Sequence, residues 1–241
     1  MLALILARAG SKGVPHKNRA VLAGRPCAAW TIDDARAARA ITRVALSTDD
    51  PELQTLGLEA GIDVVARPAE LAGDTSTVDD AARHALTALP GAPPKHVVLL
   101  YANVPVRPPD LIDRAADLLA RSGADSVQSY APVGKHHPWW TARLDDRTGA
   151  VAPWEGETLN HGVFRRQDLP PAYIPDGGVL ALTARALTLQ IPDVPAGPHA
   201  FFGLDRRGVS TAEGDVIDID SPADLRAAEA ALEQRLAEAH P

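Results

Sequence analysis

An apolar run near the start of the chain stops abruptly in a glycine-rich, basic loop. Residues 2–7 read Leu-Ala-Leu-Ile-Leu-Ala, and the following loop carries two glycines and the cations Arg8, Lys12 and Lys17. A continuous apolar run bounded by turn residues is typical of a buried parallel strand. Glycines after such a strand let the backbone approach a ligand, and free N–H groups and cations can bind phosphate oxygens. The stretch therefore predicts a triphosphate-binding loop at the end of a sheet strand.

Strands and helices alternate along the next part of the chain. The sequence predicts helices over 26–40, 51–60, 74–89 and 110–122, and strands over 41–48, 63–66, 96–101 and 125–130. Such alternation is typical of βαβ units and predicts an α/β fold with a mainly parallel central sheet. Ligands of these sheets bind outside the carboxyl ends of the strands. The loops after the strands at 2–7, 63–66 and 96–101 should therefore face one pocket.

The pattern is weaker beyond residue 130. We expect a polar and aromatic loop over 135–140, an irregular region through 154, strands over 176–181 and 216–220, and a last helix from Ser221. Asp218 and Asp220 would point the same way from their strand, because strand side chains alternate with period two. Together with a phosphate loop they suggest a Mg²⁺ site, since Mg²⁺ is held by one or two carboxylates and phosphate oxygens. A solvated Asp-x-Asp pair is the other interpretation.

Charge and cysteine content restrict the possible partners. With 24 Lys and Arg against 31 Asp and Glu, the formal charge is −7, which argues against a nucleic-acid or anionic-membrane partner. The cations of the first loop are thus a local concentration of positive charge in an acidic chain.

The single cysteine, Cys27, excludes an intramolecular disulfide, fits a reducing compartment and is expected to be a packing residue. No apolar run reaches membrane-spanning length, so we expect a soluble, cytoplasmic protein.

The opening loop and several later stretches resemble the acylneuraminate cytidylyltransferase family, which includes synthetases of CMP-N-acetylneuraminate and of other CMP-nonulosonic acids. The likeness runs, in order, through residues 6–18, 47–49, 67–71, 166–170 and 218–221. It implies a Rossmann-like nucleotidyltransferase fold in a single domain over 1–241. It also implies a homodimer, with about 132–205 contributing acceptor-site and dimerisation elements. The implied reaction transfers CMP from CTP to the hydroxyl of a sugar acid, requires Mg²⁺ and releases pyrophosphate.

The resemblance also implies roles for individual residues. The nucleotide would be bound by Arg8, Ser11, Lys12, Lys17, Asn18 and Arg67. The acceptor would be bound by Tyr101, Asn103, Arg166, Phe201 and Phe202, with the phenylalanine pair serving the neighbouring subunit. Asp218 and Asp220 would hold Mg²⁺, and the catalytic residues would be Arg8, Lys17 and Asp218. Arg8 and Lys17 suit this role because phosphoryl-type transfer depends on positioning and on stabilising the charge of the leaving group.

Some of these residues have structural alternatives. Arg67 precedes a proline and could be a surface residue at a strand end, and Phe201 and Phe202 could be ordinary core residues. His136 and His137 are adjacent and have no evident third ligand, so we do not expect a metal site there.

Departures from the family pattern gather on the acceptor side. The usual Gln-Pro-Thr-Ser-Pro-Leu-Arg reads Tyr-Ala-Asn-Val-Pro-Val-Arg over 101–107, and the usual Asn-Gly-Ala-Ile-Tyr reads Asp-Gly-Gly-Val-Leu over 176–180. The changed positions include Tyr101, Asn103, Val104, Asp176 and Leu180, and Trp139 and Trp140 stand where a sugar-contacting lysine is usual. Lost polar contacts should penalise a substrate that needs them. The acceptor is thus open between N-acetylneuraminate, another nonulosonic acid and a smaller acid such as a phosphonate. A non-catalytic nucleotide-binding homologue and an enzyme for another base are further alternatives.

Overall fold

The computed structural model describes residues 1–239, and its centre is one seven-stranded sheet in the order β11-β7-β10-β6-β1-β4-β5. The strands are β1 (Leu2–Ala7), β4 (Arg43–Thr48), β5 (Asp63–Ala66), β6 (His96–Tyr101), β7 (Ser126–Pro132), β10 (Tyr173–Thr183) and β11 (Arg206–Ser210). Strand β1 runs parallel to β4 and β6, β4 to β5, and β7 to β11. Only β10 is antiparallel to its neighbours within this sheet, β6 and β7. The predicted α/β fold with a mainly parallel sheet is therefore confirmed.

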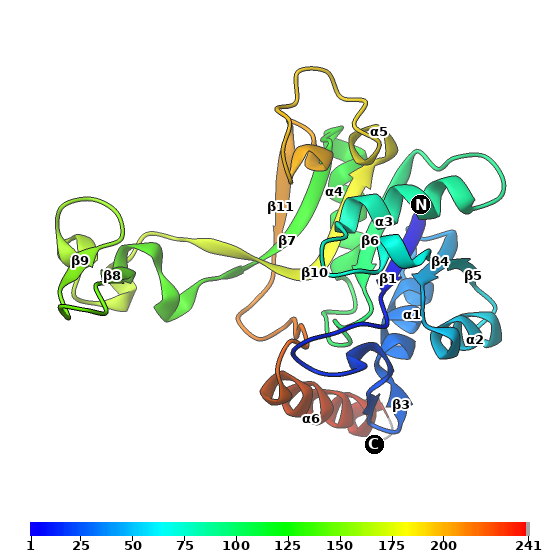
Figure 1. The fold of residues 1–241 in the computed structure, drawn as a ribbon, viewed down its shortest axis with the longest axis horizontal. Helices are drawn as coiled ribbons and strands as arrows, with labels where there is room; N and C mark the ends of the chain where they lie inside the picture. The colour runs from blue at the N-terminus through cyan, green and yellow to red at the C-terminus, as the bar shows by residue number, and fades with distance from the viewer. Residues whose placement is uncertain (240–241) are drawn as a thin grey trace.

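Helices cover both faces of this sheet (Figure 1). They are α1 (Cys27–Ala37), α2 (Pro51–Glu59), α3 (Val78–Ala88), α4 (Leu111–Ser122), α5 (Ala184–Leu187) and α6 (Pro222–Ala239). Alternate residues of β1 enter different cores: Ile5 packs in the core that contains side chains of α1, α2 and α4, whereas Leu4 packs in the core on the α3 and α5 side. This alternation is the period-two pattern of a strand buried on both faces. No described helix is long and apolar enough to cross a membrane.

A third, smaller core joins the two ends of the described chain. Helix α6 supplies Ala228 and Leu232, and the loop after β1 supplies Val14. Ile219 completes this cluster together with residues at the start of α1, where the short strands β2 (Val21–Leu22) and β3 (Arg25–Pro26) pair. The phosphate-loop region therefore packs against the last helix.

Residues 133–172 form an extension away from the body of the molecule (Figure 1). The outer parts of β7 and β10 pair as a ribbon that leads to it, with Tyr173 opposite Pro132. At its tip β8 (Ala142–Leu144) and β9 (Val151–Pro153) form a hairpin, where an irregular region was expected. The hairpin turns at Asp145, which accepts hydrogen bonds from two following N–H groups, a local device that hydrophobic periodicity does not reveal.

Several predicted boundaries are wrong for identifiable reasons. The first helix ends at Ala37 rather than residue 40, because the Asp113 carboxylate accepts hydrogen bonds from the N–H groups of Arg39 (3.2 Å) and Ala40 (2.9 Å). The third helix begins at residue 78 rather than 74, because Thr77 caps it by accepting from Asp80 N at 3.2 Å. The glycine-bearing strand is longer than 176–181, because its start pairs with β7 in the extension ribbon.

The predicted strand over 216–220 is absent, and β11 was not predicted. The segment forms one isolated bridge, between Ile217 and Val106, and its N–H groups at 217 and 219 donate to Val106 O (3.2 Å) and Asn103 O (2.9 Å). Its partner is thus a loop rather than a strand. Strand β11 reads Arg-Arg-Gly-Val-Ser and lacks an apolar alternation, so its edge position is set by pairing with β7.

Candidate active site

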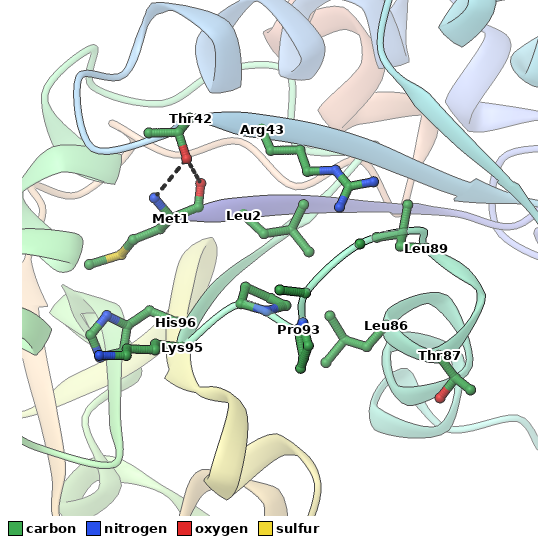
Figure 2. A pocket seen from close by; sticks show the side chains of 13 residues that line it. Met1, Leu2, Thr42, Arg43, Leu86, Thr87, Leu89, Pro93, Lys95 and His96 are labelled. Carbon is green, nitrogen blue, oxygen red and sulfur yellow. Dashed lines mark hydrogen bonds between the residues drawn. The ribbon is translucent and has the colours of Figure 1, made fainter.

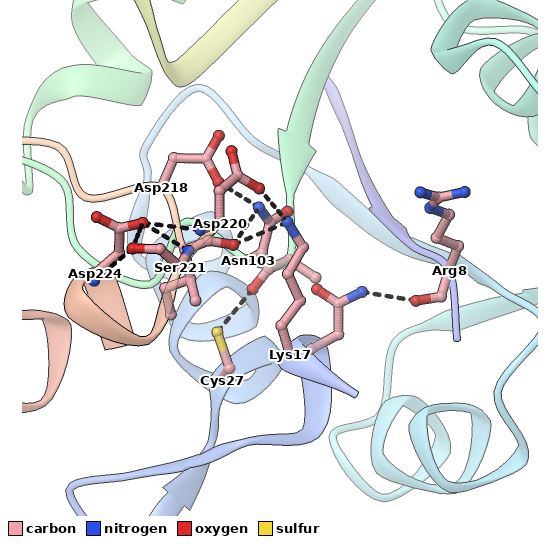
Figure 3. Close-up of polar contacts among 11 residues, drawn as sticks. Arg8, Lys17, Cys27, Asn103, Asp218, Asp220, Ser221 and Asp224 are labelled. Atoms are coloured by element: carbon pink, nitrogen blue, oxygen red, sulfur yellow. Dashed lines mark hydrogen bonds and ion pairs between the residues drawn. The ribbon is translucent and has the colours of Figure 1, made fainter. Parts of the chain in front are cut away.

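The loop after β1 is closed by its contact with the segment 217–220. The ammonium of Lys17 donates to Ile219 O (2.8 Å) and to Asp220 Oδ1 (2.6 Å), as Figure 3 shows. A Cβ atom on Gly13 would lie 2.2 Å from the carbonyl oxygen of Asp220. Glycine at 13 is therefore required by this close approach of two backbones.

A cavity of about 410 Å³ lies at this carboxyl end of the sheet. Its lining includes Arg8, Ser11, Lys12, Lys17, Asn18, Arg67, Asp74, Tyr101, Asn103 and Asp220. All the residues predicted to bind the nucleotide therefore face one space, which the loops after β1, β5 and β6 surround. The expectation of a single pocket for these three loops is confirmed.

One carboxylate holds two cations of this cavity. Arg8 Nη1 lies 3.0 Å from Asp74 Oδ1, and Lys12 Nζ lies 2.8 Å from Asp74 Oδ2. The hydrogen bonds from Lys12 and Arg8 hold the pKa of Asp74 below its ordinary value. Both cations stand where a phosphate could replace the carboxylate, since charged hydrogen bonds to phosphate and to carboxylate have similar geometry.

Arg67 is a buried part of the cavity wall and not a surface residue. It is 8% exposed, and its guanidinium donates to Ser47 Oγ (3.2 Å) and Ser47 O (2.8 Å). Burial lowers its pKa. Asn18 is also buried, and its Nδ2 donates to Arg8 O at 2.8 Å while its Oδ1 has no partner among the described residues. The hydrogen bonds of Arg67 to Ser47 and of Asn18 to Arg8 O therefore hold both side chains in the wall of the cavity.

Asp218 lies beside Asp220 and Asn103 (Figure 3). Asn103 Nδ2 donates to Asp218 Oδ1, and burial, reinforced by the charge of Asp220, raises the pKa of Asp218 to about 6. A bulge in β10 brings Gly177 close, so that a Cβ there would lie 3.4 Å from Asp218 Oδ2. Two crowded carboxylates form a locally negative site.

These carboxylates fit a hard divalent cation. Carboxylate oxygens are the donors that Mg²⁺ prefers, and two of them leave room for phosphate oxygens. In residues 1–239 no group of three or more His, Cys, Asp and Glu side chains is placed to hold a metal by itself. His136 and His137 thus form no such cluster, and a Mg²⁺ ion at Asp218 and Asp220 would need further oxygens from a ligand.

Cys27 lies below this cluster, with its Sγ 3.2 Å from Ala102 O (Figure 3). Burial raises the pKa of its thiol to about 12, so it is a protonated packing residue, as predicted.

A second cavity, of about 450 Å³, adjoins the first. The two share Thr77, Val78 and Tyr101 in their linings. Phe201 and Phe202 also line the second cavity and stack with ring centroids 4.5 Å apart. Phe201 is only 6% exposed and packs in the core on the α3 side, so this pair has both a core role and a cavity role in its own chain.

The remaining acceptor-side residues do not line either of these cavities. Arg166 lies in the extension, where its Nη2 is 3.0 Å from Glu213 Oε2 and its side chain is 58% exposed. Val104 and Leu180 are buried in the core. Trp140 donates from Nε1 to Val163 O inside the extension.

Asp176 acts as a structural clamp on the β10 bulge. Its carboxylate accepts hydrogen bonds from the Ser129 hydroxyl, from Thr211 Oγ1 (2.6 Å) and from Gly178 N (2.9 Å). Of the named positions that depart from the family pattern, Tyr101 borders both cavities and Asn103 borders the first.

A further cavity lies at the opposite end of the sheet (Figure 2). Met1, Leu2, Arg43 and His96 line it at the amino ends of β1, β4 and β6. None of the predicted site residues lies there, and ligands of parallel sheets bind at the carboxyl ends. The cavity at the carboxyl end, together with the second cavity that adjoins it, is therefore the candidate active site.

The sequence and the fold are both similar to those of known proteins. The sequence profile of the family described as "Cytidylyltransferase" matches residues 2–144. An N-acylneuraminate cytidylyltransferase of Streptococcus agalactiae is 34% identical over 180 residues, which are 74% of this chain and 42% of that relative. The chain thus spans less than half the length of that relative. A CMP-N,N'-diacetyllegionaminic acid synthase of Legionella pneumophila is 28% identical over 238 residues, 97% of this chain and 96% of the relative.

Solved structures show the same fold. A CMP:2-keto-3-deoxy-manno-octonic acid synthetase complexed with CTP superposes with a TM-score of 0.71 at 16% identity, covering 97% of this chain and 98% of that one. A 4-diphosphocytidyl-2C-methyl-D-erythritol synthase from Anaerococcus prevotii superposes with a TM-score of 0.64 at 15% identity, covering 96% and 97%.

Proposed function

Because this chain belongs to the cytidylyltransferase family, we propose that it transfers CMP from CTP to the hydroxyl of a sugar acid and releases pyrophosphate. The observation that carries the proposal is the first cavity, in which every predicted nucleotide residue faces the same space beside a second cavity. Two relatives named for N-acylneuraminate and for N,N'-diacetyllegionaminic acid support a sugar acid as the acceptor.

The cations of the first loop would bind the triphosphate. Arg8 and Lys12 would leave Asp74 and take up phosphate oxygens, while Lys17 would remain at the junction with Asp220. The acceptor hydroxyl would attack the α-phosphorus and lose its proton to solvent, while the bond from the α-phosphorus to the bridging oxygen breaks and the departing pyrophosphate gains negative charge. Arg8 and Lys17 would stabilise this charge, and stabilisation of charge is the main contribution that a protein makes to such a transfer.

Asp218 and Asp220 would hold the Mg²⁺ required by this chemistry. When bound, the ion neutralises charge on the phosphate oxygens and lowers the pKa of an oxygen that it contacts. The pKa of Asp218 near 6 leaves this carboxylate ionised at neutral pH. Asn103 orients it through the hydrogen bond to Oδ1.

We also propose that the protein is a cytoplasmic homodimer that pairs through the extension. This part of the chain exposes large apolar side chains, with Phe164 92%, Leu144 63% and Trp154 55% exposed. Such side chains gathered on one projecting element favour burial against a partner. Light scattering should give the dimer mass, and F164S should shift it toward the monomer; a monomeric wild type contradicts the pairing.

The activity is tested by pyrophosphate release from CTP with Mg²⁺. The acceptor panel contains N-acetylneuraminate, N,N'-diacetyllegionaminate, 2-keto-3-deoxy-manno-octonate and 2-hydroxyethylphosphonate, and GTP, UTP and ATP replace CTP in parallel assays. We expect release with CTP and at least one sugar acid. Folded protein that binds CTP but is silent with the whole panel contradicts the enzyme, and preference for another nucleotide contradicts the assignment to CTP.

A further inference from the structure

Helix α1 carries three polar side chains on the face that it buries. Cys27, Thr31 and Asp34 follow the helical period, so they lie along one stripe of the helix, and each of them is buried. Buried polar groups need hydrogen-bond partners. All three find a partner in residues 102–107, the loop that follows β6. This loop is therefore attached to α1 by side chains that have no part in the proposed reaction.

Arg107 is the centre of this attachment, because its guanidinium reaches three separate parts of the chain. Its side chain is 1% exposed. Nε donates to Gly178 O (3.1 Å), Nη2 to Val104 O (2.6 Å) and Nη1 to Asp34 Oδ2 (3.2 Å). The donors of a guanidinium are arranged in a rigid planar fork. The bulge of β10, the loop after β6 and α1 are therefore joined at one buried point.

The two carbonyl groups that Arg107 holds belong to neighbours of the residues that flank the Asp218 carboxylate. On one side Asn103, which precedes the first of these carbonyls in the chain, donates from Nδ2 to Asp218 Oδ1 (Figure 3). On the other side Gly177 precedes the second, and a Cβ on this glycine would lie 3.4 Å from Asp218 Oδ2. Arg107 thus acts on the surroundings of this carboxylate through the main chain.

The segment that carries Asp218 is bound to the same loop. Ile217 N donates to Val106 O (3.2 Å), and Ile219 N donates to Asn103 O (2.9 Å). A shift of residues 103–106 would therefore move the backbone on both sides of Asp218 as well as its hydrogen-bond partner.

Asp34 compensates the charge of Arg107 in the core, and a second arginine compensates Asp34. Arg235 of α6 donates from Nη2 to Asp34 Oδ1 at 3.0 Å. The Asp34 side chain is 5% exposed, whereas that of Arg235 is 43% exposed. Because Arg235 can still pair with Asp34 when Arg107 is replaced, an uncharged residue at 107 leaves no unpaired carboxylate in the core. The contribution of Arg107 to the site can therefore be tested by substitution.

We propose that Arg107 is a positioning residue for the cation site: it sets the spacing of the two backbones around Asp218 and so orients this carboxylate toward a bound metal ion. The inference rests on the proposed function and deepens it. Groups that orient a metal ligand without touching the metal change metal affinity or activity by about 10- to 100-fold when they are replaced. An effect of this size is expected for Arg107, although it lines neither cavity.

The test measures the binding of Mn²⁺, which prefers the same oxygen ligands as Mg²⁺. Free Mn²⁺ is followed by electron paramagnetic resonance with protein and CTP but without acceptor, and Mn²⁺ binding by CTP alone is the reference. R107M keeps an apolar side chain of similar length but has no donor. Its Kd for Mn²⁺ should rise by about 10- to 100-fold. The Kd for CTP without metal should stay within about twofold, because Arg107 does not line the nucleotide cavity.

Three further variants separate positioning from stability. R107K keeps the charge but lacks the fork, so its Mn²⁺ affinity should lie between those of R107M and the wild type. R235Q removes the exposed partner of Asp34 and should bind Mn²⁺ as the wild type does. D113A removes a largely buried carboxylate that accepts hydrogen bonds from the turn after α1 and lines neither cavity. It should lower the free energy of unfolding and leave Mn²⁺ binding unchanged.

Pyrophosphate release gives a second measurement. At saturating CTP, Mg²⁺ and acceptor, kcat of R107M should fall by about 10- to 100-fold, whereas D113A should keep the wild-type kcat. Thermal denaturation identifies a temperature at which the variants are folded. If R107M is unfolded there, R107K decides, since it must bind Mn²⁺ more weakly than both the wild type and D113A.

The outcomes for Arg107 and for the proposed function are distinguishable. Weaker Mn²⁺ binding in R107M, with partial recovery in R107K and wild-type affinity in D113A, supports the positioning role. Unchanged Mn²⁺ affinity in R107M, or a loss that R235Q or D113A shares, overturns this role while the transfer of CMP stands. A wild type that binds CTP and Mn²⁺ but releases no pyrophosphate contradicts the transfer alone, because Mn²⁺ binding is measured without acceptor. A wild type that binds no Mn²⁺ beside CTP overturns the positioning role together with the metal site.

Discussion

The ammonium of Lys17 lies 2.6 Å from Oδ1 of Asp220, so the loop after the first strand and the segment before the last helix form one site. The Lys17 side chain is only 16% exposed, although that of Asp220 is 73% exposed. The lysine is thus ordered at the edge of the cavity, where it can serve a phosphate and the neighbouring carboxylate together.

Replacing Lys17 should reduce catalysis more than stability. In the proposed reaction Lys17 would face the departing pyrophosphate, so K17M should lower kcat/KM for CTP by about 10²- to 10³-fold, as when one stabilising donor of a transition state is lost. Steady-state pyrophosphate release measures this fall. K95M changes a lysine at the opposite end of the sheet and should keep full activity. A wild-type rate in K17M would remove Lys17 from the mechanism.

Removing the carboxylate that holds Arg8 and Lys12 should tighten CTP binding. Asp74 competes with phosphate for both cations, and D74N lacks the charge that makes it a competitor. Because the three side chains are exposed to solvent, we expect a modest decrease in the Kd for CTP, about two- to fivefold. Calorimetric titration without Mg²⁺ measures it. Weaker binding in D74N would mean that Asp74 instead positions the cations for the nucleotide.

D218N should stabilise the protein at neutral pH much more than in acid. The pKa of Asp218 is raised to about 6 in the folded state, above the value of about 3.9 in an unfolded chain. Between these values the folded state binds more protons, so the wild type loses stability as the pH rises from about 4 to 6. The asparagine variant lacks this loss. Melting temperatures at pH 4 and pH 7.5, in buffer with EDTA, compare the two.

Asp224 provides the matched control for this measurement. Its hydrogen bond from Ser221 holds its pKa below the ordinary value, so its stabilising contribution is present at neutral pH and disappears as the pH falls. D224N should therefore be destabilised at pH 7.5 and less so in acid, the opposite sign to D218N. The same pH dependence in both variants would contradict the assigned environments.

G13A should damage the site through backbone crowding. The added Cβ would lie 2.2 Å from Asp220 O, whereas a Cβ on Gly10 has nothing within 4 Å. Overpacking of this kind should lower the free energy of unfolding by about 1–3 kcal/mol and separate the loop from Asp220. G10A, in the same loop, should leave denaturant unfolding unchanged. Equal stability of both variants would show that the two segments can move apart freely.

Elements that can be recognised from their own residues were predicted correctly from the sequence. The strand predicted over 2–7 and the helix predicted over 51–60 follow from local pattern, and the structure has a strand at Leu2–Ala7 and a helix at Pro51–Glu59. Strand β11 is an edge strand that is defined by its pairing with β7, and residues 216–220 pair with a loop. The secondary structure of these two segments therefore could not be predicted from their own residues. The identity of a partner far along the chain is the information that periodicity lacks.

The candidate site also has a part that could be predicted from the sequence and a part that could not. The glycines and cations of the first loop mark the nucleotide cavity by themselves, because phosphate binding needs those residue types together. Arg166, in contrast, matched the family motif, yet the structure pairs it with Glu213 outside both cavities.

The small core shared by Val14, Ile219 and Leu232 has a consequence for biosynthesis. The phosphate loop leaves the ribosome before the residues that it packs against, because Ile219 and Leu232 follow it in the chain. A nascent chain therefore completes this side of the nucleotide cavity only after residues 219–232 have emerged.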